Sequence, residues 1–214
     1  MTEQSYSGIF IGEGSSDMPI SEIVESLFFD RGITLHLSKP DFGLLGKVAK
    51  DVRSRILAGE KLNDGRVDLI VVHRDADNAG IEARRAEISN AAEAIESSPT
   101  ILPVIPVRMT EAWLLLDEQA IRTVAGNPRG RADLELPKWH EVESHADPKN
   151  LLNECLLKAA DVSGRRRERI AKRFNQNRRQ LLERLDKDGP VTKLGSWKNL
   201  VHDIEIITED WLAS

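Results

Sequence analysis

The hydrophobic pattern of the chain is clearest near its middle, where Val67 to Val72 is apolar at every position except Asp68. A run of this kind predicts a strand that is covered on both faces, which is typical of parallel sheets in α/β domains. Asp75 and Asp77 follow directly and lead into a predicted turn. Because functional groups of open α/β sheets lie beyond the carboxyl ends of such strands, these two acids stand where a site is expected.

The segments before this strand alternate between the two regular patterns. Tyr6–Ile11 and Ile33–Leu37 are predicted strands, and Pro19–Phe29 has apolar residues three and four positions apart, as an amphipathic helix has. Leu44–Leu57 shows the same helical spacing. The order strand, helix, strand, helix, strand predicts a mostly parallel, right-handed layered sheet of the Rossmann-like α/β class.

Further elements are predicted after the two acids. Gly80–Glu96 is rich in alanine and predicts a helix, and Thr100–Val107 predicts an edge strand because its two prolines cannot donate to a neighbouring strand. A change of composition at Val124–Gly130 places a boundary between an α/β domain over residues 1–125 and a helical C-terminal extension, packed on it, over residues 126–214. The remaining predicted helical segments are Ala112–Asp117, Pro148–Ala160, Gly164–Asp186 and Ser196–Leu212.

Composition restricts the classes of protein to which the chain can belong. Among its 214 residues, hydrophobic and charged contents are ordinary, and the net charge of −5 provides no global attraction for nucleic acid. Cys155 is the single cysteine, which excludes an internal disulfide and any multi-cysteine zinc site. The first five residues lack the features of a signal peptide, and no apolar run has the length of a membrane span, so we expect a cytoplasmic protein.

A glycine-rich loop, Gly12-Glu13-Gly14-Ser15-Ser16-Asp17, follows the first predicted strand. It departs from the dinucleotide-binding pattern because Asp17 stands in place of the third glycine, and Glu13 would bring negative charge towards a phosphate. A helix N-cap explains Asp17 about as well as any role in a site. No phosphate-binding loop with the pattern G-x-x-x-x-G-K-[S/T] occurs, so the chain is not expected to hydrolyse ATP by itself.

Acidic residues follow three separate predicted strands, namely Glu13, the pair Asp75 and Asp77, and Glu111. The carboxyl ends of parallel strands share one edge of a sheet, so these acids are predicted to converge. Converging carboxylates repel one another unless a cation neutralises them, and Mg²⁺ prefers oxygen ligands of this kind. In the alternative interpretation, Asp77 or Asn78 caps the next helix and Asp75 is a solvated loop residue.

A glutamate after the first strand and Asp-x-Asp after the third resemble the signature of the TOPRIM domain. The chain is more closely similar to a TOPRIM-like family known as domain of unknown function 4276, and the resemblance covers most of its length. The matching segments are Gly12–Asp17, His73–Asp77, Glu111–Asp117 and Asp147–Leu152.

This resemblance implies Mg²⁺- or Mn²⁺-dependent phosphodiester chemistry. Tyr6, the one tyrosine, lies within a predicted strand, which disfavours a topoisomerase, and a single cysteine cannot build the zinc modules of primases. A nuclease remains, similar to TOPRIM nucleases of the overcoming-lysogenization-defect type, some of which act in phage defence with a partner ATPase. The alternative is a non-catalytic module that binds metal or nucleic acid within a larger complex.

The resemblance also assigns roles to individual residues. Asp75 and Asp77 would hold the metal ion, and Glu13 would be either a further ligand or the base that activates water. Glu111 would complete a second metal position, and Asp17 is a weaker candidate ligand. Lys149 would offset negative charge in the transition state, although a surface lysine is the simpler interpretation.

A cluster of basic residues in the predicted helix Gly164–Asp186 is a candidate surface for the nucleic-acid backbone. A solvated helix face or docking to an acidic partner protein explains the cluster equally well. Binding to nucleic acid would be salt-sensitive and have little sequence specificity. DNA or RNA as substrate, and a homodimer as assembly, stay open. The candidate contact residues are Arg165, Arg166, Arg169, Lys172 and Arg173.

Overall fold

The computed structural model of the protein describes residues 4–93, 95 and 99–213. Contacts between Cα atoms divide the chain into two compact units. The first comprises residues 1–105 and 199–214, and the second comprises residues 106–198. The domain boundary predicted at residue 125 therefore falls inside the second unit.

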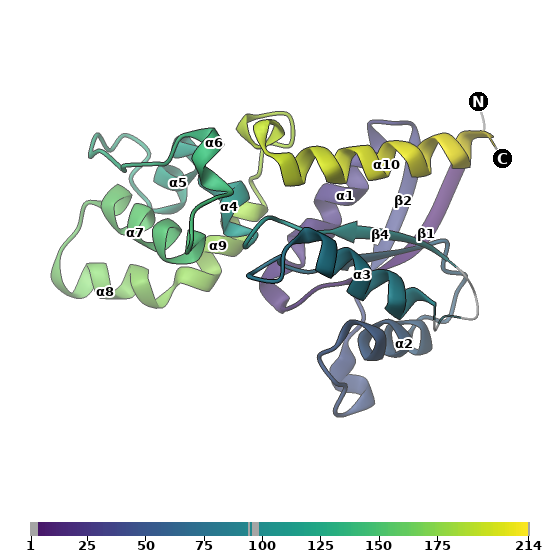
Figure 1. The fold of residues 1–214 in the computed structure, drawn as a ribbon. Coiled ribbons are helices and arrows are strands. Elements are labelled where there is room, and N and C mark those ends of the chain that lie inside the picture. The colour runs from purple at the N-terminus through teal and green to yellow at the C-terminus, as the bar shows by residue number, and fades with distance from the viewer. Residues whose placement is uncertain (1–3, 94, 96–98, 214) are drawn as a thin grey trace. The chain divides into compact units, whose positions relative to one another are not determined.

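The first unit contains a sheet of four parallel strands in the order β2-β1-β3-β4 (Figure 1). Their bounds are β1 Gln4–Ile11, β2 Ile33–Ser38, β3 Leu69–His73 and β4 Thr100–Val104. The buried run predicted as a central strand is β3, which pairs with β1 on one side and β4 on the other. β4 is an edge strand, as predicted, but it ends at Val104 rather than Val107, so Pro103 lies within it and Pro106 beyond it. The predicted α/β class with a parallel sheet is confirmed for these residues.

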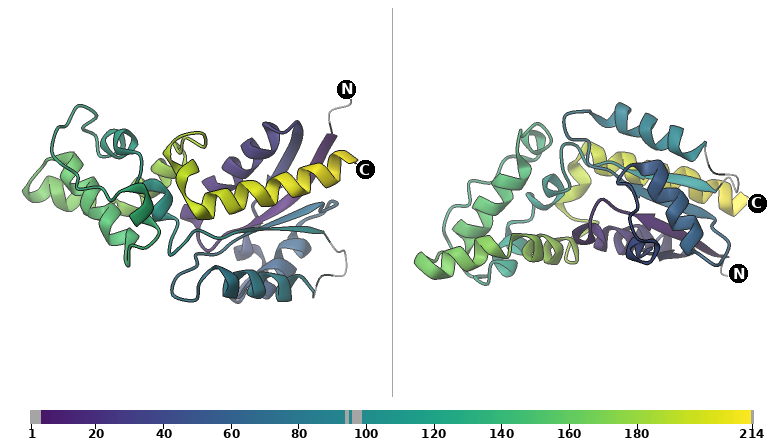
Figure 2. Two further views of the ribbon diagram at one scale, coloured as in Figure 1. Left: turned by 45° about the horizontal axis from the view of Figure 1, so that its top comes forward. Right: turned by 90° about the horizontal axis from the view of Figure 1, so that it is seen from below.

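Helices cover both faces of this sheet, as the two views in Figure 2 show. The helix α1 (Pro19–Phe29), as predicted from its apolar spacing, lies on one face together with α10 (Gly195–Ala213), whose Trp211 stacks on Tyr6 and Phe28. The helices α2 (Val52–Leu62) and α3 (Ile81–Ala92) cover the other face. The core on that side contains Ile9, Ile11, Val52, Ile56, Ile70, Val72 and Ile88.

Two predicted helices of this unit differ at their ends. The segment predicted as a helix from Leu44 instead forms a short 3-10 turn, Phe42–Leu45, and α2 begins only at Val52. Gly46, at a φ of 76°, turns the chain away from a helix, and the Asp51 carboxylate caps α2 by accepting a hydrogen bond from the Ser54 amide. The helix predicted over Gly80–Glu96 corresponds to α3, and Glu96 lies outside the described residues.

The second unit is helical in the part of the chain described. Trp113 and Trp197 meet edge to face in its interior, and Trp113 donates a hydrogen bond to Ser196. The helix predicted over Pro148–Ala160 is confirmed, with the Asp147 carboxylate as its cap. The elements are α4 Glu111–Leu114, α5 Glu118–Val124, α6 Trp139–Val142, α7 Pro148–Ala160, α8 Gly164–Lys172, α9 Phe174–Leu182, the 3-10 turn η3 Pro190–Lys193, and the start of α10.

The single long basic helix predicted over Gly164–Asp186 is wrong, because the structure divides it into α8 and α9. The chain leaves helical geometry at Arg173, where φ is −96° and ψ is 12°. The two parts meet different surroundings, since α8 buries none of its residues whereas α9 buries one face. Within the described ranges, none of the helices has both the length and the apolar character needed to cross a membrane.

Candidate active site

The loop that carries Glu13 is held by hydrogen bonds within itself and by hydrogen bonds from α2. It leaves β1 after Ile11 and forms a 3-10 turn, in which the Asp17 carboxylate accepts a hydrogen bond of 2.9 Å from the Gly14 amide. Arg55 of α2 donates to the carbonyl oxygens of Gly12 and Glu13. Asp17 therefore caps this turn, whereas α1, for which Asp17 or Ser16 was the predicted cap, begins without a side-chain cap hydrogen bond.

The two aspartates after β3 flank a residue that belongs to the core. Ala76 is 2% exposed and packs under α3, and its carbonyl oxygen accepts hydrogen bonds from the amides of Ala79 and Gly80. Asp77 adopts a left-handed backbone conformation with a φ of 47°. Aspartate tolerates this region better than most residues do, but the conformation still costs free energy. The burial of Ala76 and this tight turn fix the positions from which Asp75 and Asp77 extend.

The carboxylates of Glu13 and Asp75 lie within each other's electrostatic field. Burial is the main cause that raises the pKa of Glu13, and the negative charge of Asp75 is the next, with a smaller contribution from Asp77. The positive charges of His73 and Arg74 act in the opposite direction. Glu13 contacts Arg74, the residue before Asp75, at 2.8 Å, so the loops that follow the paired strands β1 and β3 lie together at one edge of the sheet, as the parallel arrangement of the strands predicts.

His73, the last residue of β3, lies buried beneath the acids. Its Nε2 atom is 3.4 Å from a carboxylate oxygen of Asp75, and its Nδ1 atom is 3.7 Å from one of Asp17. Burial, the strongest influence, lowers the pKa of His73, but the hydrogen bond and charge of Asp75, with the charges of Asp17 and Glu13, outweigh it. The pKa of His73 is therefore raised, which favours an imidazolium among the acids.

Two arginines stand among the same acids, and both share a partner on α3. Arg74 contacts Glu13 at 2.8 Å and Glu87 at 3.4 Å. Arg84 contacts Glu87 at 2.8 Å and Asp77 at 3.3 Å, and its Nε donates to the backbone carbonyl of Asp75. The hydrogen bond to Glu87 is the main cause that raises the pKa of Arg84. Sequence reasoning missed Arg84 and Glu87, whose helical spacing of three was the only available signal.

The donor chemistry of this cluster fits a hard divalent cation, because Glu13, Asp75 and Asp77 offer carboxylate oxygens. The positions of these side chains, however, do not form a metal site as they stand. In the described part of the chain, no group of three or more His, Cys, Asp or Glu side chains is placed to hold a metal ion. Each of these acids instead faces a cation of the protein, so a metal ion would have to draw Glu13 from Arg74 and Asp77 from Arg84.

Two other predicted site residues belong to the second unit. Glu111 is 3% exposed and accepts a hydrogen bond of 2.9 Å from Arg178, which is equally buried. This ion pair gives Glu111 a structural role that does not require a metal ion. Lys149 is exposed on α7 and borders an open pocket of about 340 Å³. The other residues that line the pocket are Asp147, Asn150, Asn153, Ala171 and Phe174.

The basic residues predicted to contact nucleic acid are all exposed on α8 and at its end. They are Arg165, Arg166, Arg169, Lys172 and Arg173. Arg178, which the sequence places in the same basic segment, points inward instead and pairs with Glu111. The exposed group keeps its predicted role as a hypothesis.

No protein-family description matches the chain, and neither the curated proteins nor the solved structures contain a significant match to it.

Proposed function

We propose that the protein is a metal-dependent nuclease that cleaves phosphodiester bonds at the cluster formed by Glu13, Asp75 and Asp77. The observation that carries the proposal is the approach of acids from two separate strand ends. Glu13, after β1, contacts Arg74 at 2.8 Å, and the next residue, Asp75, contacts His73 at 3.4 Å. Carboxylate oxygens gathered in this way are the ligands that a hard divalent cation prefers, and in the form described here cations of the protein offset their charge. The resemblance to the TOPRIM signature points to the same class of chemistry.

Each acid of the cluster has its own part in this proposal. Asp75 and Asp77 would hold Mg²⁺ or Mn²⁺, and Glu13 would either join them or accept a proton from the attacking water. When bound, the metal ion would stabilise negative charge on the phosphate. The burial that raises the pKa of Glu13 also makes its carboxylate a better proton acceptor. The exposed arginines of α8 would contribute contacts to the backbone of the nucleic acid.

A second candidate, a non-catalytic binding module, is favoured by a different observation. Glu13 and Asp77 already form ion pairs with Arg74 and Arg84, and Asp75 lies beside His73. A closed network of this kind can stabilise a fold or hold a partner without any reaction. Participation in phage defence with a partner ATPase rests on the resemblance alone and belongs to the nuclease proposal.

The test is incubation of the purified protein with labelled DNA and with labelled RNA in Mg²⁺ or Mn²⁺. We expect metal-dependent cleavage that Asp75→Asn reduces by at least about 100-fold, because loss of a ligand removes several kcal/mol of transition-state stabilisation. Glu82→Gln is the matched control, since Glu82 is an exposed acid in the first turn of α3. Intact substrate under all conditions, with binding retained, would favour the non-catalytic module.

A further inference from the structure

The two guanidinium groups at the acidic cluster are arranged in the same way. Each contacts one acid that is a candidate metal ligand and one that is not. Arg74 contacts Glu13 and Glu87, whereas Arg84 contacts Asp77 and Glu87. Glu87, a residue of α3, thus contacts both arginines and does not belong to the loops that carry the acids.

The charges of this network determine whether an anion can bind beside a metal ion. If Glu13 and Asp77 turned towards a divalent cation, Glu87 would remain as the carboxylate that both arginines contact among the described residues. The side chains of Arg74 and Arg84 are only 21% and 18% exposed, so water would compensate them incompletely. An anion with two or more oxygens, placed beside the metal ion, would restore the balance, and guanidinium groups bind phosphate oxygens well.

We propose, building on the function proposed above, that Arg74 and Arg84 form the phosphate-binding pair of the site and that Glu87 positions them. In the form described here, Glu13 and Asp77 occupy the places that phosphate oxygens take. Metal ion and phosphodiester therefore promote each other's binding, because the metal ion releases the arginines and the phosphate releases the acids. The proposed substrate is therefore a phosphodiester whose phosphate is bound by the two arginines that Glu87 of α3 positions.

The arrangement predicts opposite effects on two binding equilibria. Arg74→Met and Arg84→Met should weaken binding of a fluorescein-labelled oligonucleotide by about 10-fold or more, since each removes charged hydrogen bonds to phosphate. The same variants should bind Mn²⁺ more tightly than wild type in the absence of oligonucleotide, because Glu13 or Asp77 loses its competing partner. Glu87→Gln should weaken Mn²⁺ binding, because both arginines then keep only the candidate ligands.

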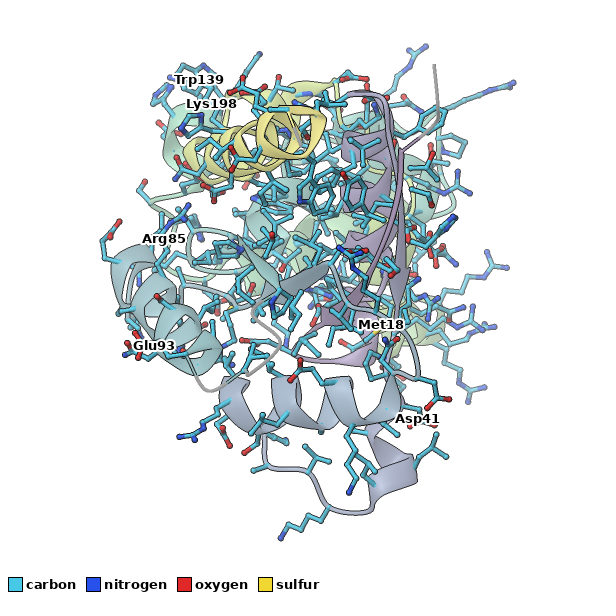
Figure 3. All side chains as sticks on the ribbon, turned by 90° about the vertical axis from the view of Figure 1, so that its right-hand side faces the viewer. Met18, Asp41, Arg85, Glu93, Trp139 and Lys198 are labelled. Atoms are coloured by element: carbon cyan, nitrogen blue, oxygen red, sulfur yellow. The ribbon has the colours of Figure 1, made fainter. Side chains whose placement is uncertain are left out.

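Arg85 provides the matched control on the same helix. It is the next residue after Arg84, appears on α3 in Figure 3, and pairs with Asp203 at 2.7 Å rather than with the acidic cluster. Arg85→Met should leave Mn²⁺ affinity and oligonucleotide affinity within about 3-fold of wild type. Arg74→Lys and Arg84→Lys keep the charge if the methionine variants do not fold. They should still lose oligonucleotide affinity, because lysine lacks the two-sided fork.

The experiment measures Mn²⁺ binding by electron paramagnetic resonance and oligonucleotide binding by fluorescence anisotropy in Ca²⁺ and in EDTA. Tighter Mn²⁺ binding together with weaker oligonucleotide binding in the arginine variants supports the phosphate-binding pair. If wild type binds Mn²⁺ but the arginine variants lose Mn²⁺ affinity, or bind oligonucleotide normally, the pair is refuted and the nuclease proposal stands. If wild type binds no Mn²⁺, the metal-dependent function fails, and an unchanged oligonucleotide affinity in the variants would remove the pair as well.

Discussion

The buried ion pair between Glu111 and Arg178 leads to a quantitative prediction about the second unit. Both side chains are about 95% buried, at 5% and 6% exposure, and their atoms approach to 2.9 Å. Removal of one partner takes away the ion pair that offsets the other charge in the interior, which costs about 3–5 kcal/mol. Arg178→Met should therefore lower the free energy of unfolding by that amount and the melting temperature by at least about 6 °C.

The size of the effect depends on which partner remains. The double variant Glu111→Leu with Arg178→Met removes both charges of the pair, and such replacements are often neutral, so it should regain most of the loss. Arg179→Met is the matched control, because Arg179 is exposed and pairs with Glu183 four residues later. Its loss should be at most about 0.5 kcal/mol. Urea unfolding of these variants, of the single variant Glu111→Leu and of wild type, followed by circular dichroism, measures these differences. A double variant as unstable as the sum of the two single variants would refute the argument, and so would a cost below about 1 kcal/mol for Arg178→Met.

Three further predictions concern the first unit and Cys155. Burial is the main cause that raises the pKa of the Cys155 thiol to about 11. At pH 8 the thiol of the native protein should therefore react with a disulfide reagent more than about 100-fold more slowly than that of the unfolded chain, and the absorbance of the released product measures both rates. Asp77→Val should cost about 1–3 kcal/mol in thermal melts because valine resists a φ of 47°, whereas Asp77→Gly should not incur this strain. Gly8→Ala should lower the free energy of unfolding by about 1–3 kcal/mol, and with it the urea midpoint, since the new Cβ would meet the Leu69 carbonyl oxygen at 2.3 Å. An unchanged midpoint would mean that β1 and β3 can separate.

The parts of the fold that the sequence predicts are those whose signals are local. The apolar run of β3, the spacing along α1 and the Asp147-Pro148 start of α7 each specify an element within a few residues. The start of α2 was misplaced because apolar residues from Leu44 onwards continue the helical spacing. The backbone nevertheless turns at Gly46, and Leu44 is 75% exposed. There the turn and cap residues outweighed the periodic pattern.

The candidate site divides in the same way. Glu13, Asp75 and Asp77 can be predicted because parallel strands bring their carboxyl ends to one edge. Their cationic partners cannot be predicted in this way, because which acid an arginine pairs with depends on distances in the folded chain, which the sequence does not give. Arg84 and Glu87 lie on a helix with little contrast between its faces in sequence, yet both turn towards the strand ends. Glu111 shows the opposite case, since a residue predicted for the site pairs with Arg178 of its own unit.

The use of arginine rather than lysine at positions 74 and 84 follows from the geometry of these contacts. Arg74 contacts Glu13 through one terminal nitrogen and Glu87 through the other, and Arg84 contacts Glu87 and Asp77 in the same manner. A lysine ammonium is a compact charge on a flexible stem and cannot bridge two carboxylates with a planar fork. The guanidinium fork allows one partner to be exchanged while the other holds the side chain in place. In the proposed function, an exchange of this kind would couple metal ion and phosphate without movement of α3, because Glu87 would contact both arginines in either state.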